Sequence, residues 1–301
     1  MTTPPVPACS IVVGVDGTPA SDRALSWAVA QARARHLGLT VLHATGRHAT
    51  TAPAEPGEAG GGTASSLRAD GRQVTRTAVH SLRRAGFDGA VEELLVPASA
   101  VDALVEASTN ADLLVVGARE PGPLGTFVLG SVRRTLVDRS RCPVVVVPAP
   151  GPSEDGRGVL VAVADQEPSR AALDFAYLQA RLTDRPVTVL GCLLESGRVL
   201  AGSGAPDAGD VERHRDFLRE VTAPYTTDLP DVVTTIEVDR GPVDEAVVRT
   251  APGHDLVVLG ARAHSWISRL FGRDGTHWVV AQAPCPVAIV PEPDGNPSSP
   301  T

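Results

Sequence analysis

A glycine-rich stretch from Gly117 to Ser131 has the composition and position of a phosphate-binding loop. It follows the apolar run at residues 111–116 and precedes residues 132–137, whose sequence predicts a helix. Such a turn can hold phosphates, because glycine lets the backbone approach the ligand and the first N–H groups of the helix attract an anion. The alternative is a surface loop that only connects the two elements, and this stretch alone leaves both interpretations open.

A carboxylate follows the first apolar run of the chain. Residues 10–15 are typical of a strand that is buried on both faces, and Asp16-Gly17-Thr18-Pro19 follows as a turn. A carboxylate at this position can accept hydrogen bonds from a ribose hydroxyl or coordinate a metal ion. Aspartate is also a common turn and helix-capping residue, so Asp16 is compatible with both roles.

The composition excludes several other functions. The chain contains no lysine, so it has neither a P-loop lysine nor a Schiff-base nucleophile. Its eight histidines show no metal-ligand spacing, and Ser131 has no histidine close in sequence, so we expect no metal site and no catalytic residue of the triad kind. The net charge of −8, without a long run of one sign, argues against nucleic-acid binding.

The cysteines and the apolar runs indicate the compartment. The four cysteines form no C-x-x-C pair, and we expect Cys142 and Cys285, both followed by Pro-Val, to be small buried residues rather than redox centres. Residues 1–5 lack the features of a signal peptide, and no apolar run approaches the length of a membrane span. We therefore expect a cytoplasmic protein without disulfides or a membrane segment.

The elements that would position the glycine-rich stretch alternate regularly between strand and helix. Helices are predicted from Ser21 to near Gly38, over 66–85, over 98–108 and after Ser131. This alternation predicts a parallel, doubly wound sheet with right-handed crossovers. The predicted strands are residues 10–15, 39–44, 91–96, 112–116 and 143–148.

The same pattern then begins again. Residues 111–119 match residues 254–262, and residues 141–148 match residues 284–291, both with an offset of 143. A shared offset over two separate blocks indicates an internal duplication. We therefore predict two α/β domains, 8–149 and 157–292. Each is expected to be Rossmann-like, with a doubly wound parallel sheet of five strands in the order 3-2-1-4-5.

This strand order predicts where a ligand would bind. In a doubly wound sheet the ligand crevice lies outside the carboxyl ends of the strands, where the strand order reverses. That point falls between the first and fourth strands, which end at Gly14-Val15-Asp16 and Gly117-Ala118-Arg119. The topology thus favours a phosphate site over a simple connecting loop.

With these features the chain resembles the universal stress protein family in its tandem, two-domain form. The most specific mark is the spacing G-x-x-G-x9-G-[S/T], which here reads Gly117, Glu120 in place of the middle glycine, and Gly130-Ser131. Supporting marks are residues 13–17 at the first strand and residues 141–144 before the last. The resemblance covers nearly the whole chain apart from the tails and residues 46–66.

The resemblance implies an ATP site, with or without Mg²⁺, in which the glycine-rich backbone holds the phosphates while Asp16 and Ala44 lie by the ribose and adenine. It also implies that the last strands of the two domains pair as an internal pseudo-dimer, and it leaves a further homodimer open. The site residues that the resemblance implies are Gly14, Asp16, Ala44, Gly117, Ala118, Arg119, Gly130, Ser131 and Val132.

Two departures from the family pattern change these expectations. A carboxylate at Glu120 that is about 5 Å from a phosphate charge costs about 3 kcal/mol at an effective dielectric near 20, so we expect weakened binding. In the second copy Gly260 keeps the first glycine, but Ala263 and Arg273-Asp274 replace the others, and Ala164 replaces Asp16. We expect this copy to have lost nucleotide binding and to have a structural role.

Three functional hypotheses remain. The first is a regulator of a stress or dormancy response that binds ATP in the N-terminal domain. The second is a scaffold that acts only through contacts with protein partners, without nucleotide. The third is a slow ATPase, for which the sequence offers no general base.

Overall fold

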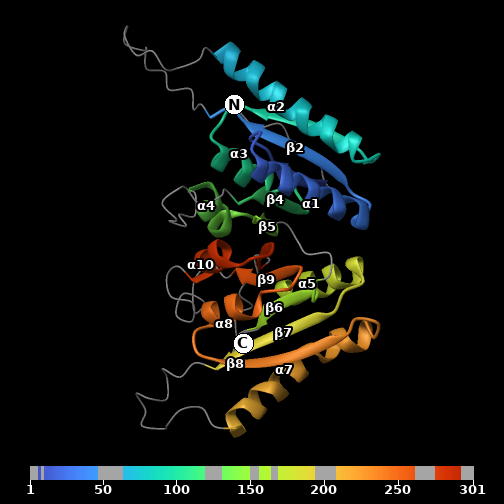
Figure 1. The fold of residues 1–301 in the computed structure, drawn as a ribbon, viewed down its shortest axis with the longest axis vertical. Coiled ribbons are helices and arrows are strands. Elements are labelled where there is room, and N and C mark those ends of the chain that lie inside the picture. The colour runs from blue at the N-terminus through green and yellow to red at the C-terminus, as the bar shows by residue number, and fades with distance from the viewer. Residues whose placement is uncertain are drawn as a thin grey trace, which may run out of the picture. The chain divides into compact units, whose positions relative to one another are not determined.

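The computed structural model describes residues 6–7, 10–46, 64–118, 131–149, 156–163, 169–193, 208–261 and 275–292. The described residues up to Val147 form one compact unit, and those from Pro148 onward form another. They are called unit 1 and unit 2 below, and each is a parallel sheet with helices on both faces (Figure 1). The predicted repeated α/β fold is therefore confirmed.

The sheet of unit 1 contains, among the described residues, five parallel strands in the order β3-β2-β1-β4-β5. This is the predicted 3-2-1-4-5 order. The central strands are continuous apolar runs because helices cover them on both faces, and Ile11, Val12 and Val13 are fully buried. The strands are β1 (Ser10–Gly14), β2 (Gly38–Ala44), β3 (Val91–Val96), β4 (Leu113–Gly117) and β5 (Val144–Val147).

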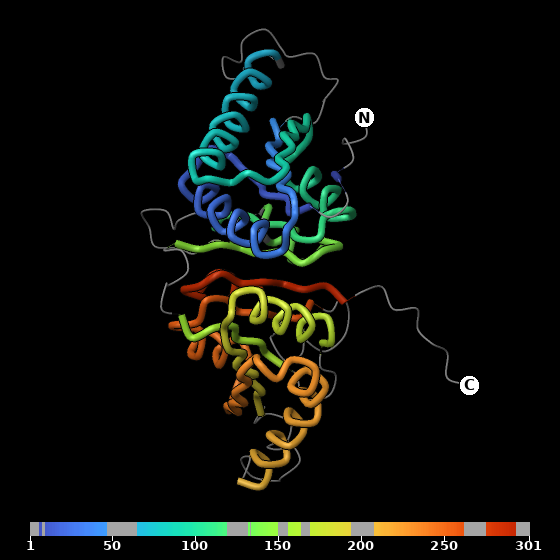
Figure 2. Tube along the Cα trace, turned by 90° about the vertical axis from the view of Figure 1, so that its right-hand side faces the viewer, coloured from blue at the N-terminus to red at the C-terminus, as the bar shows by residue number. Residues whose placement is uncertain are grey.

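The helices of unit 1 pack in pairs. Helix α1 contacts α2, and α3 contacts α4, so that each pair covers one face of the sheet (Figures 1 and 2). This arrangement follows from right-handed crossovers that run first to one side of β1 and then to the other. The helices are α1 (Pro19–Arg35), α2 (Ala64–Arg84), α3 (Ala100–Ala107) and α4 (Ser131–Arg139).

The predicted start of the first helix at Ser21 is wrong. Helix α1 begins at Pro19, and the Oγ1 of Thr18 caps it by accepting a hydrogen bond of 3.4 Å from the N–H of Ser21. Proline suits the first helical position because its φ is already helical and its missing N–H has no partner there in any case. At the other end His36, with a φ of 54°, takes the left-handed position that closes the helix.

Unit 2 repeats this architecture. Within its described residues the strand order is β8-β7-β6-β9-β10, which corresponds to the order of unit 1 element by element. Its strands are β6 (Val159–Val163), β7 (Val187–Leu193), β8 (Thr234–Arg240), β9 (Leu256–Ala261) and β10 (Val287–Pro291). Its helices are α5 (Arg170–Thr183), α7 (Ala208–Asp228), α8 (Val243–Thr250) and α10 (Gly275–Gln282).

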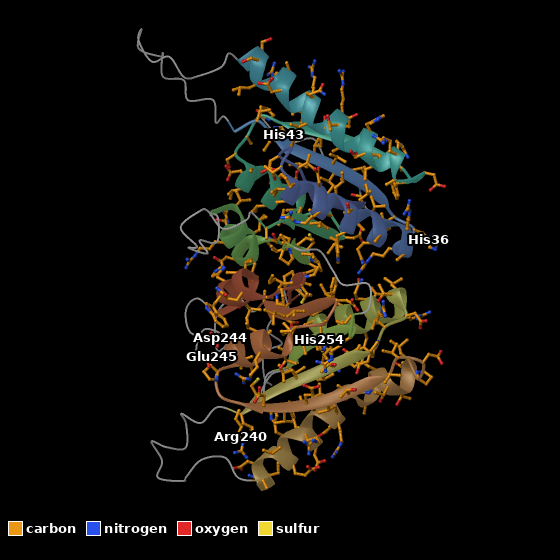
Figure 3. The ribbon with its side chains drawn as sticks, in the orientation of Figure 1. His36, His43, Arg240, Asp244, Glu245 and His254 are labelled. Atoms are coloured by element: carbon orange, nitrogen blue, oxygen red, sulfur yellow. The ribbon has the colours of Figure 1, made fainter. Side chains whose placement is uncertain are left out.

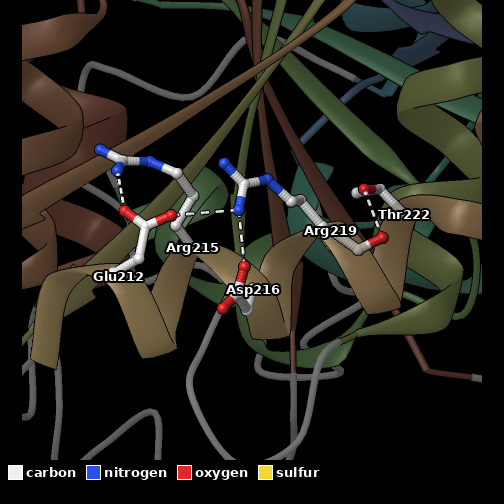
Figure 4. Close-up of polar contacts among 5 residues, drawn as sticks. All are labelled: Glu212, Arg215, Asp216, Arg219 and Thr222. Carbon is white, nitrogen blue, oxygen red and sulfur yellow. Dashed lines mark hydrogen bonds and ion pairs between the residues drawn. The ribbon is translucent and has the colours of Figure 1, made fainter. Parts of the chain in front are cut away.

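The outer face of α7 is a solvated surface of paired charges. Glu212 accepts hydrogen bonds from Arg215 at 2.5 Å and from Arg219 at 3.1 Å, and Arg219 also donates to Asp216 at 2.5 Å (Figure 4). Exposed pairs of this kind add little to stability. We interpret them as a solvated helix face and not as a binding site. Throughout the part of the chain that the structure describes, no helix combines the length and apolar character of a membrane span.

Candidate functional site

The crevice of unit 1 lies at the carboxyl ends of β1 and β4. These strands pair directly, with Val13 opposite Val115, while the crossovers that flank them run to opposite sides of the sheet. The chain segments that leave this point are residues 14–16 and residues 117–118. The structure thus brings Gly14, Asp16, Gly117 and Ala118 to one edge, as the sequence predicts, and their part in binding stays a prediction.

Asp16 organises the turn between β1 and α1. Its Oδ1 accepts hydrogen bonds from the N–H of Thr18 at 3.1 Å and from the Oγ1 of Thr18 at 2.5 Å. Gly17 between them has a φ of +77°, which favours glycine. Thr18 in turn caps α1. Asp16 therefore has the turn role that the sequence left open, and its exposed carboxylate still lies at the edge of the crevice.

Gly117 is required by packing. A Cβ atom at Gly117 would lie 2.1 Å from the carbonyl oxygen of Ala20, in the first turn of α1. The equivalent Gly260 of unit 2 is also crowded, here by a side chain, because its Cβ atom would lie 2.4 Å from the Cβ of Ser169, the residue that caps α5. The end of the fourth strand touches the first helix in both units, which explains why Gly260 persists in the copy whose motif differs.

The backbone of Ala118 is already hydrogen-bonded. Its N–H donates to the carbonyl of Val147 at 2.7 Å, and its carbonyl accepts from the guanidinium of Arg23 at 3.4 Å. Ala118 can therefore line the crevice, but its N–H is engaged within the protein. This N–H is therefore not available to a ligand in the described structure.

The predicted phosphate residues lie largely outside the described part of the chain. Arg119, Glu120 and Gly130 fall outside it, as do Ala164, Ala263 and Arg273-Asp274 of the second copy. Ser131 is the first residue of α4, and Val132 behind it is half-buried. The first N–H groups of α4 have no partner within the helix, which is the usual basis of anion binding at a helix start.

Ala44 forms part of a small apolar wall. It lies at the end of β2 opposite Val96 of β3, and the following N–H of Thr45 donates to the carbonyl of Val96 at 3.0 Å. In unit 2 the same paired positions hold Cys192 and Asp239. Asp239 accepts hydrogen bonds from Arg249 at 3.2 Å from Nε and 2.6 Å from its terminal nitrogen, so this edge of unit 2 carries an ion pair.

His43 lies next to Ala44 at the edge of unit 1, and the sequence interpretation missed it. Its Nδ1 lies 2.8 Å from the carbonyl oxygen of Val15, and Figure 3 shows it at the end of unit 1 opposite to His36. A histidine near the end of a largely apolar strand was the available signal. From the sequence we considered the histidines only as metal ligands, and not a hydrogen bond from His43 to the backbone.

The three cysteines in the described part of the chain are poor nucleophiles. Burial raises the pKa of Cys142, Cys192 and Cys285 to about 12 in each case, so these thiols stay protonated at neutral pH. The expectation that Cys142 and Cys285 are buried is confirmed. Among the described residues, no group of three or more histidine, cysteine, aspartate or glutamate side chains could hold a metal ion.

The sequence matches a known protein family over both units. The model of the universal stress protein family matches residues 10–148 and again residues 157–291. The universal stress protein Rv2005c of Mycobacterium tuberculosis is 30% identical over 272 residues, which cover 88% of each chain. A second protein of that organism, Rv2028c, is 28% identical over 283 residues, covering 93% of this chain and 95% of the other.

Solved structures agree with this match. A universal stress protein from Archaeoglobus fulgidus covers 95% of this chain and 100% of its own, with a TM-score of 0.71 and 16% identity, which shows the same fold over both units. A shorter universal stress protein, solved in complex with cAMP, is 30% identical over 46% of this chain, with a TM-score of 0.37.

Proposed function

The chain belongs to the universal stress protein family, and on that premise we propose that it is a regulator of a stress or dormancy response that binds ATP in unit 1. Unit 1 retains Asp16, a small apolar wall at Ala44 and a glycine-rich segment that enters α4. Binding, rather than catalysis, is the chemistry that these groups supply. Hydrolysis would be slow at most, since the sequence offers no general base.

The contrast between the apolar wall of unit 1 and the charged edge of unit 2 carries the choice of unit 1. Adenine is flat and largely apolar, and ligand pockets for such groups are lined mainly by apolar side chains. The paired positions Ala44 and Val96 meet this requirement. The corresponding Asp239 of unit 2 is bound to Arg249, and covering that ion pair with a base would cost desolvation without replacing its hydrogen bonds.

Unit 2 then has a structural or partner-binding role. It keeps the full strand order and the glycine that packs against its first helix, so its core is intact. Its partners would be proteins, and its charged edge does not resemble an adenine pocket. This division of roles combines the first and second hypotheses, with nucleotide in one unit and protein contacts on the other.

The ligand that copurifies with the protein tests this proposal. The full chain is purified without added nucleotide and denatured, and the released small molecules are identified by chromatography and mass spectrometry. We expect an adenine nucleotide, or, if the site is empty after purification, binding of added ATP with Mg²⁺. If no nucleotide copurifies and millimolar ATP with Mg²⁺ does not bind, only the scaffold function is left.

A further inference from the structure

We infer that His43 is a positioning residue of the nucleotide site, whose ring fixes the carbonyl of Val15 and thereby the turn that presents Asp16. The inference rests on the proposed function for its consequence in binding. Its structural basis, however, is independent of any ligand. It assigns a role to a side chain that would otherwise be an unexplained histidine in an apolar strand.

The imidazole completes the pairing of β1 where the strand ends. The N–H of Val15 donates to the carbonyl of Leu42 at 2.9 Å, which is the last backbone bond between β1 and β2. The carbonyl of Val15 instead meets the Nδ1 of His43 at 2.8 Å. Because a carbonyl oxygen only accepts, Nδ1 carries the proton and donates it. A side chain thus holds the residue immediately before Asp16.

The turn that follows is connected to this bond. Asp16 accepts two hydrogen bonds from Thr18, and the Oγ1 of Thr18 accepts from the N–H of Ser21 in the first turn of α1. The bond from His43 to Val15 and the bonds between Asp16 and Thr18 are therefore joined by the peptide link between Val15 and Asp16. Removing the donor at His43 frees the carbonyl of Val15 and loosens the attachment of the turn.

The opposite edge of the ring packs against α2. A Cβ atom at Gly71 would lie 2.6 Å from the Cδ1 of Leu95 and 3.0 Å from the Cδ2 of His43, so glycine at this point of the helix leaves room for both side chains. The ring is therefore held between the end of β1 and the backbone of α2. This restraint sets the direction in which Nδ1 points.

In unit 2 the glycine and the histidine of this contact exchange places between strand and helix. Gly191 occupies the strand position of His43, and the imidazole comes from His214 on α7, whose Nε2 would lie 2.2 Å from a Cβ atom at Gly191. Both units thus pack one imidazole against one glycine between their second strand and the helix that follows it. Because either arrangement fills the space, packing alone does not explain why the imidazole of unit 1 is on the strand. The strand position is the one from which it reaches Val15.

Two substitutions separate the hydrogen bond from the volume of the ring. His43→Leu introduces an apolar side chain of similar bulk that has no donor, whereas His43→Asn keeps an N–H near the place of Nδ1 with less bulk. Each full-length variant is checked by thermal unfolding. Two readouts follow: hydrogen exchange of the peptide that covers residues 13–22, and affinity for ATP with Mg²⁺. His214→Leu is the matched control in unit 2.

We expect His43→Leu to speed exchange in residues 13–22 and to weaken ATP binding by about tenfold, the usual effect of one hydrogen bond to a group that needs it. His43→Asn should stay close to the wild type in both readouts, and His214→Leu should leave residues 13–22 and ATP affinity unchanged. Faster exchange without any ATP binding by the wild type would refute the proposed function but support the positioning role.

Other outcomes overturn the inference. If His43→Leu matches the wild type in exchange and affinity, the bond to Val15 positions nothing. If His43→Asn loses as much as His43→Leu, the bulk of the ring matters and the donor does not. Should His43→Leu fail to fold, the asparagine variant alone decides the question, because loss of binding in a folded variant that keeps the donor contradicts the inference.

Discussion

The carbonyl oxygen of Ala20 lies where a side chain on Gly117 would begin, 2.1 Å from the position of its Cβ atom. The end of β4 and the first turn of α1 therefore touch through their backbones. A glycine at this position is needed to close the fold, whether or not a phosphate binds beyond it. Loss of ATP binding in a Gly117 variant would consequently not distinguish a damaged site from a damaged fold.

We expect Gly117→Ala to destabilise unit 1 by about 1–3 kcal/mol, the usual cost of overpacking, because the obstacle is backbone that cannot rotate away. Gly14→Ala is the matched control, since its Cβ atom would meet the Cδ2 of Leu104 at 3.2 Å and the Cγ1 of Val116 at 3.4 Å, both side-chain atoms that can move. Urea unfolding measures both variants. Equal stability of the two would contradict this packing account.

The glutamate in the glycine-rich stretch gives a prediction about affinity. Glu120→Gly should strengthen ATP binding by about tenfold or more, because it removes a negative charge close to the phosphates. Glu120→Gln separates charge from backbone freedom: most of the gain should appear with glutamine if repulsion is the cause. Isothermal calorimetry measures both variants, and unchanged affinity in both would mean that the carboxylate never meets the phosphates.

The buried thiols should be unreactive in the folded protein. With pKa values raised to about 12 by burial, Cys142, Cys192 and Cys285 form almost no thiolate at about pH 8. In a Cys9→Ser background, a disulfide reagent such as Ellman's should modify none of the three before denaturation and all of them afterwards. Rapid modification of the native variant would show that at least one thiol is accessible.

The stability of unit 2 should depend on pH through His254. Burial, with a smaller contribution from Arg157, lowers the pKa of this histidine below its usual 6.5. As the pH falls below 6.5 the unfolded state takes up the proton first, so the free energy of unfolding decreases until the pH reaches the folded-state pKa. Above 6.5 both states are neutral and His254 contributes no pH dependence.

His254→Asn tests this prediction, because the amide can still donate to the carbonyl of Thr250 that Nδ1 contacts at 3.0 Å. Urea unfolding between about pH 7.5 and about pH 5.5 should show a smaller loss of stability in the variant than in the wild type. The neighbouring Asp255, whose pKa is raised by burial, contributes with the opposite sign. Because His254 lowers the pKa of Asp255, the difference between the two curves reports on both groups together. Parallel curves would contradict the assignment.

The strand order was predictable because the buried strands are continuous apolar runs, and the repeat fixed both copies at once. The start of α1 was missed, although Thr18 followed by Pro19 is the usual pattern of a helix cap and first helical residue. The packing role of Gly117 depends on how closely another backbone approaches, which no local pattern encodes. The pair of Asp239 and Arg249 likewise depends on how α8 packs beside β8.

His43 shows why the site could be predicted only in part. Sequence spacing locates the ends of β1, β2 and β4 at one edge, so the crevice and Asp16 follow from the topology. The hydrogen bond from His43 to Val15 joins residues that are 28 apart in sequence, and it depends on the register of β1 against β2. Side chains that act through a neighbouring backbone group leave no motif.

We propose that unit 1, and not unit 2, holds the nucleotide. Calorimetric titration of the full chain with ATP and Mg²⁺ tests it most directly, together with Ala44→Leu in the wall of unit 1 and Arg249→Ala at the corresponding edge of unit 2. The account predicts one ATP per chain, with affinity reduced about tenfold or more by Ala44→Leu and unchanged by Arg249→Ala. Two ATP per chain, or equal losses in the two variants, would contradict it.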